Sequence, residues 1–149
     1  METTISIKRS SIKFWFTIFK VDIGIHNLSP NNQVLFHHIE LLQKNELEFF
    51  QNLYDNQYNL SYPILLDRKE THKNIRIKKE EIQIILNELI KLEETMFLTI
   101  FPLLNNYLDQ RLEKTSENID IDKLSIDNLI HILEEKDNQY FSILNNSNK

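Results

Sequence analysis

The chain has 149 residues, a formal net charge of −5 and no cysteine. The acidic balance disfavours duplex nucleic acid as the main partner, because neutralising phosphates requires a basic face. Without cysteine, disulfides, thiolate catalysis and cysteine-ligated zinc are excluded. Hydrophobic residues make up 41% and charged residues 26% of the chain, which is typical of a single globular domain over residues 1–149.

Residues 1–28 form an aromatic and β-branched N-terminal segment that contains the only glycine, Gly24. Apolar side chains alternate with others from Ile12 to Ile18, a period of two that favours an extended segment with a small β element. A short amphipathic helix fits the same residues, and the pattern does not separate these alternatives. In either structure Trp15 is expected to anchor the packing.

The apolar run Ile12–Ile25 lies where a secretory signal would lie, but Lys20 and Asp22 interrupt it and no small-residue cleavage site follows. It is also too short and too charged to span a bilayer, which needs ~20 apolar residues. We therefore expect a cytoplasmic protein with no membrane contact.

The first long helix is predicted to begin at Ser29 and Pro30, a typical N-cap followed by proline at the first helical position. Apolar residues then recur at spacings of three and four until Tyr62-Pro63, where the helix should stop. Residues 30–61 therefore form either one helix or two helices with a break near Lys44-Asn45.

A second long helix is predicted from Glu80, with two apolar stripes along its length. Because both stripes are present, the part from Met96 to Leu108 is apolar nearly all round, as in a central helix or an oligomer interface. Pro102 should kink this helix near the preceding turn.

The last helix is predicted to start at Lys123 or Ser125, after an acidic loop over Glu113–Asp122, and to end at Leu144. Residues 146–149 should fray. The expected fold class is mainly α: three long helices or a four-helix bundle over residues 29–145, with a small N-terminal β element as one alternative.

The connection between the two long helices carries the only concentration of positive charge. Its basic residues are Arg68, Lys69, Lys73, Arg76, Lys78 and Lys79. Neighbouring carboxylates dilute this charge, so the first interpretation is a solvated loop. The alternative is a site for an anionic ligand or single-stranded nucleic acid. Ile75 and Ile77 in the same connection fit a short strand.

Two histidine–glutamate pairs at i, i+3, His37 with Glu40 and His131 with Glu134, have a spacing that builds metal centres in helical bundles. Projected on a helix, both pairs point away from the apolar stripes. They should therefore face solvent, and no cofactor is expected. Asp137 instead falls on an apolar stripe, where a carboxylate should be paired, ligating or at the rim of the core.

Three segments resemble the helix signatures of hemerythrin-like proteins, which hold a di-iron centre in a four-helix bundle. The segments are residues 23–42, LEFFQNLYDNQYNLSYPIL and LIHILEEKDNQY. At the ligand positions of that family this chain has Asn32, Gln57, Ser61, Ile132 and Asp137. Only Asp137 is a typical ligand, and the third-helix histidine pair has no counterpart. The resemblance therefore implies a bundle that has lost its metal.

The leading functional hypothesis is a non-catalytic interaction protein, such as an adaptor, inhibitor or regulatory subunit, that binds another protein or itself. A single glycine excludes a glycine-rich phosphate loop, and no serine lies in a nucleophile elbow, so we expect no enzyme. The surplus apolar surface predicts the interface. Its expected residues are Phe14, Trp15, Phe16, Phe19, Phe97, Phe101, Leu104 and Leu108. The alternatives are a residual metal-binding bundle that uses Asp137 and an anion binder that uses residues 68–79.

Overall fold

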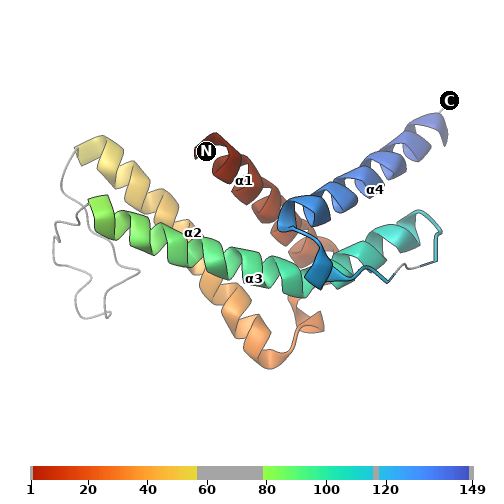
Figure 1. Cartoon of the computed structure of the whole chain (residues 1–149), viewed down its shortest axis with the longest axis horizontal. Helices are drawn as coiled ribbons and strands as arrows, with labels where there is room; N and C mark the ends of the chain where they lie inside the picture. The colour runs from red at the N-terminus through yellow and green to blue at the C-terminus, as the bar shows by residue number, and fades with distance from the viewer. Residues whose placement is uncertain (1, 57–78, 116–117, 148–149) are drawn as a thin grey trace. The chain divides into compact units, whose positions relative to one another are not determined.

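The computed structural model describes residues 2–56, 79–115 and 118–147. In chain order the α-helices are α1 (Glu2–Ile18), α2 (Pro30–Asn56), α3 (Lys79–Arg111) and α4 (Ile126–Ser147) (Figure 1). These ranges contain no strand, and the prediction of a mainly α fold is confirmed. None of the described helices has an apolar stretch of the length that crossing a bilayer requires.

The chain divides into two compact units. The α1/α4 unit contains Met1–Leu28 and Glu93–Lys149, and the α2 unit contains Ser29–Leu92. Helix α3 belongs to both, because the division falls within it. The expectation of a single domain stays a prediction.

The N-terminal segment is helical, so the extended or β interpretation is wrong and the helical alternative is confirmed. Four buried side chains at helical spacing explain the choice: Ile12, Trp15, Phe16 and Phe19. Phe14, which belongs to the alternating pattern, is instead 49% exposed. Burial of one helical face therefore outweighed the β propensity of the individual residues.

Helix α1 ends in a π-helical turn, η1 (Phe19–Ile23), and a short 3-10 helix, η2 (Ile25–Asn27), follows. Gly24 lies between them with φ of 104° and ψ of 138°. Its N–H donates to the Phe19 carbonyl at 2.8 Å, which closes the π turn. Only glycine adopts this backbone conformation without strain, so the single glycine of the chain marks the end of the N-terminal helical segment.

Helix α2 begins where the Ser-Pro signal predicts. The Ser29 Oγ accepts a hydrogen bond from the Asn32 N–H at 3.3 Å, and Pro30 is the first helical residue. The helix is continuous through Lys44-Asn45, which confirms one helix rather than two up to Asn56. The predicted stop at Tyr62-Pro63 lies outside the described residues.

Helices α3 and α4 lie close to their predicted bounds. Helix α3 starts one residue before Glu80 and continues through Pro102 to Arg111; the kink at the proline stays a prediction. The Ser125 Oγ caps α4 by accepting from the Asn128 N–H at 3.2 Å. The predicted start at Lys123 is wrong, because a 3-10 helix (Ile121–Lys123) ends there. Helix α4 also includes residues 146 and 147, which were expected to fray.

Two buried carboxylates of α3 hold the α1/α4 unit together. Glu93 is 0% exposed and accepts two hydrogen bonds from the Arg9 guanidinium, Nε at 2.8 Å and Nη2 at 3.1 Å. Asp109 is 1% exposed and pairs with the Lys136 Nζ at 2.7 Å. Lys136 also donates to the buried Asn105. One pair ties α1 to α3, and the other ties α4 to α3.

We predict that Arg9→Met lowers the free energy of unfolding by about 3–5 kcal/mol, because it removes the guanidinium that donates two hydrogen bonds to the buried Glu93 carboxylate. Lys8→Met is the matched control. Lys8 pairs with Glu94 at 3.1 Å, but both side chains are partly exposed, and such pairs contribute about 0–1 kcal/mol. Urea denaturation of both variants measures the difference, and equal losses would contradict the role assigned to Glu93.

Gly24→Ala should lower the free energy of unfolding by about 1–3 kcal/mol, the typical range for a strained backbone conformation. A β-carbon there would also lie 2.6 Å from the His26 Nδ1. That ring is exposed and can rotate away, so His26→Ala should restore little of the loss. Thermal denaturation of both single variants and the double variant tests this; a stability unchanged by Gly24→Ala would contradict it.

Candidate functional site

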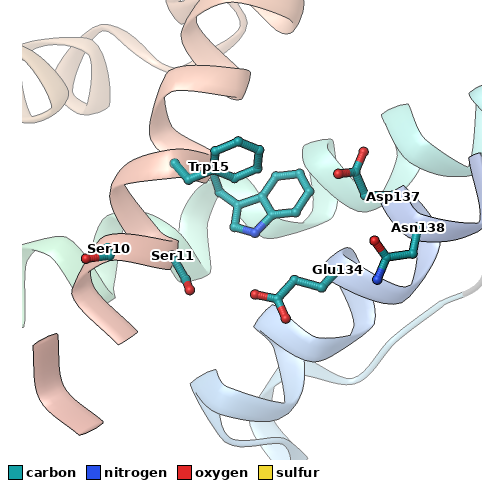
Figure 2. A pocket seen from close by; sticks show the side chains of 7 residues that line it. Ser10, Ser11, Trp15, Glu134, Asp137 and Asn138 are labelled. Carbon is teal, nitrogen blue, oxygen red and sulfur yellow. The ribbon is translucent and has the colours of Figure 1, made fainter. Parts of the chain in front are cut away.

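A pocket of about 380 Å³ opens between α1 and α4 in the α1/α4 unit (Figure 2). Helix α1 contributes residues at i, i+1, i+4 and i+5, and α4 contributes residues at i, i+3 and i+4. These spacings place each set on one face of its helix. The lining residues are Ser10, Ser11, Phe14, Trp15, Glu134, Asp137 and Asn138.

Trp15 forms the buried part of this pocket and presents an unsatisfied donor. Its side chain is 1% exposed, and its Nε1 has no acceptor among the described residues. Figure 2 shows the indole nitrogen directed into the space between α1 and α4, toward Glu134. A buried donor without a partner costs about 1–3 kcal/mol, so an acceptor that entered the pocket would gain a favourable contact.

The neighbouring Phe14 provides the accessible aromatic surface. Its ring stands edge-on to the Trp15 ring, with centroids 5.0 Å apart and an interplanar angle of 79°. Because Phe14 is half exposed and Trp15 is buried, the two rings form the rim and the floor of the same pocket.

Two carboxylates one helical turn apart, Glu134 and Asp137, face the pocket from α4. Glu134 is exposed and has no ion-pair partner among the described residues. His131, the partner expected from the sequence, pairs with Glu135 at 3.1 Å. Asp137 is half-buried, and its desolvation raises the pKa of the carboxyl above the ordinary value. The positive charge of Arg111 opposes part of this shift.

Arg111 is held beside the site by a polar network. Its Nη1 donates to the Tyr107 hydroxyl at 2.8 Å, and that hydroxyl donates to Asp22 Oδ2 at 2.8 Å. Burial, followed by the hydrogen bond to Asp22, raises the pKa of Tyr107. The guanidinium also stacks 3.8 Å from the centroid of the Tyr140 ring. Arg111 therefore contacts Tyr107 and Tyr140. It forms no ion pair with Asp137 in the described structure.

The lining combines groups that suit ligands of different chemistry. Carboxylates and an exposed aromatic ring attract organic cations, while the Trp15 N–H and the Asn138 amide bind acceptors. The two lining serines have no lining histidine or lysine to activate them. No group of three histidine, aspartate or glutamate side chains in the described ranges is placed to hold a metal ion.

Most residues of the predicted interface are buried in the protein core. Seven of its eight residues are buried: Trp15, Phe16, Phe19, Phe97, Phe101, Leu104 and Leu108. The apolar half of α3 is therefore a central helix, and in this conformation its side chains do not reach a partner. Only Phe14 remains exposed, and it lies at the pocket.

Both histidines of the histidine–glutamate pairs and Glu134 face solvent as predicted, whereas Glu40 is only 30% exposed. The side chains of His37 and His131 are 65% and 69% exposed. His37 lies 3.6 Å from Glu40, whereas His131 pairs with Glu135 rather than Glu134.

Several predicted site residues fall outside the described ranges. They are Gln57, Ser61, Arg68, Lys69, Lys73, Arg76 and Lys78. The strand predicted at Ile75 and Ile77 lies outside these ranges as well. Lys79 is the first residue of α3. Of the remaining hemerythrin-like positions, Asn32 lies in α2, and Ile132 and Asp137 lie in α4. The metal-bundle and anion-binding alternatives therefore stay predictions.

The sequence singled out Trp15 and Asp137 separately, but it contains no signal that they line one pocket. Nothing in the sequence marks Ser10, Ser11 and Asn138 as pocket residues, because they cannot be told apart from other polar residues on the solvent-facing side of a helix. Comparison with known proteins finds no matching family model, curated protein or solved structure.

We predict that Asp137→Asn makes the protein more stable at neutral pH. A folded-state pKa raised above the unfolded value of ~3.9 means that the folded state binds the proton more tightly. Ionisation of Asp137 therefore reduces stability as the pH rises from the unfolded pKa through the folded pKa. The variant should gain stability above this window and lose the gain below it.

Urea denaturation at pH 3 and pH 7 measures this dependence, with Glu134→Gln as the control because it removes an exposed carboxylate from the same helix. A destabilised Asp137→Asn protein at pH 7 would contradict the prediction.

Proposed function

We propose that this chain is a non-catalytic helical protein that binds a protein partner through the face formed by α1 and α4, as an adaptor, inhibitor or regulatory subunit does. The observation that carries the proposal is a surface pocket in which the Trp15 donor and the Glu134 carboxylate have no partner among the residues that the structure describes. Such a pocket offers interactions that the described ranges of the chain do not use. The cytoplasmic location is part of the same proposal.

Exposed apolar residues of α4 support a macromolecular partner. Phe141 and Leu144 follow Asp137 at i+4 and i+7, so they continue the pocket-bearing face of the helix toward its C-terminal end. Their exposed fractions are 55% and 38%. Protein interfaces combine an apolar centre with polar groups at the rim, and this face of α4 offers both.

The test is affinity capture of the tagged full-length protein from its native cells, with quantitative mass spectrometry. We expect a protein of different sequence near 1:1 stoichiometry, and we expect the double variant Phe141→Glu/Leu144→Glu to lose it. Ile143→Glu is the matched control, because Ile143 is 50% exposed but lies on another face of α4. Circular dichroism verifies that each variant is folded.

Two results would contradict the proposal. One is a wild-type preparation that retains no protein near 1:1. The other is a partner that the folded double variant retains as well as the Ile143→Glu control does.

A further inference from the structure

The pocket presents groups of opposite hydrogen-bonding character in one small space. Glu134 and Asp137 accept hydrogen bonds and carry negative charge, whereas the buried Trp15 Nε1 only donates. A ligand that satisfies all three must combine a cation with a neutral acceptor. A lone metal ion or a simple anion meets only half of this requirement.

We propose that the pocket between α1 and α4 receives a lysine or arginine side chain of the protein partner, with the cation at Glu134 and Asp137 and a carbonyl oxygen of the same segment at the Trp15 N–H. This inference rests on the proposed function, because it names the chemistry of the partner. A basic residue within a peptide carries both groups that the pocket lacks.

Three observations favour a long basic side chain over other cations. The half-exposed Phe14 ring offers a surface for an aliphatic stem or a guanidinium. A pocket of about 380 Å³ leaves room for such a chain, whereas a single ammonium group would leave most of it empty. The pocket opens to solvent along exposed residues of both helices, Ser10, Phe14, Glu134 and Asn138, which allows a polypeptide to lie across it.

The charges around the pocket agree with a basic occupant. Arg111 is the cation that acts on Asp137, and it offsets only part of the negative charge of the two lining carboxylates. Glu134 remains without a cation among the described residues. The pocket is therefore complementary to an added positive charge.

The chain contains one tryptophan, so Trp15 reports binding without any label. We would titrate the full-length protein with N-acetyl-arginine methylamide and N-acetyl-lysine methylamide, following the single indole N–H resonance by NMR and the tryptophan fluorescence. The matched neutral probes are the citrulline and norleucine derivatives, which keep the shape of each side chain without its charge. Constant ionic strength separates specific binding from screening.

We expect saturable shifts of the indole N–H with the basic probes, at millimolar affinity for so small a ligand, and at least about tenfold weaker binding of the neutral probes. The double variant Glu134→Gln/Asp137→Asn should weaken binding of the basic probes by a similar factor. Glu135→Gln is the control, since it removes a carboxylate of α4 that does not line the pocket, and it should bind as the wild type does.

Three results would overturn the inference: no saturable shift with either basic probe, equal responses to basic and neutral probes, or unchanged binding by the folded double variant. A stronger response to glycine methylamide than to the acetylated basic probes would also overturn it, because the pocket would then recognise a chain N-terminus. The two proposals fail separately. Captured partner with no probe binding contradicts only the basic-side-chain inference, and probe binding with no captured partner contradicts only the proposed function.

Discussion

Two buried carboxylates of α3 each form an ion pair with a neighbouring helix, and the α1/α4 unit depends on these two ion pairs. Glu93 and Asp109 are almost completely removed from solvent, and a buried carboxylate without a partner would be strongly destabilising. Arg9 of α1 and Lys136 of α4 provide the partners. Apolar contacts alone tolerate sliding of one helix along another, whereas each ion pair is satisfied at only one register.

This register determines what α4 presents to α1. Lys136 is directed to Asp109 on α3, and successive helical residues differ by about 100° in direction. Asp137 therefore points toward the space beside α1, together with Glu134 and Asn138. The pocket is thus a consequence of how α3 positions its two neighbours, although no residue of α3 lines it.

Two buried polar atoms of the α1/α4 unit have no hydrogen-bond partner among the described residues. Most buried donors and acceptors in folded proteins have partners, so each exception requires an explanation. Asp109 Oδ2 also lacks a hydrogen bond among the described residues, but its other oxygen is paired with Lys136. Trp15 Nε1 has no partner in the described part of the chain and is directed into a pocket, where the proposed ligand would supply an acceptor.

Local signals in the sequence were sufficient for α2, α3 and α4. Ser29 and Ser125 cap their helices as such residues do in isolation, and apolar periodicity indicated the helical faces. It also placed His37 and His131 correctly in solvent. These properties depend on residues within a few turns of one another, so they could be predicted without knowledge of the fold.

Tertiary packing decided the rest. The pattern of residues 12–18 was compatible with a strand and a helix, and burial of Trp15 with its helical neighbours selected the helix. Glu93 and Glu94 look alike in sequence, yet Glu93 is buried and Glu94 is partly exposed. Both pair with residues of α1 that are distant in the chain, so the difference in burial depends on how the helices pack. The pocket likewise joins residues near the two ends of the chain. Helical periodicity identifies the face on which a residue lies, but only the packed helices determine what that face meets.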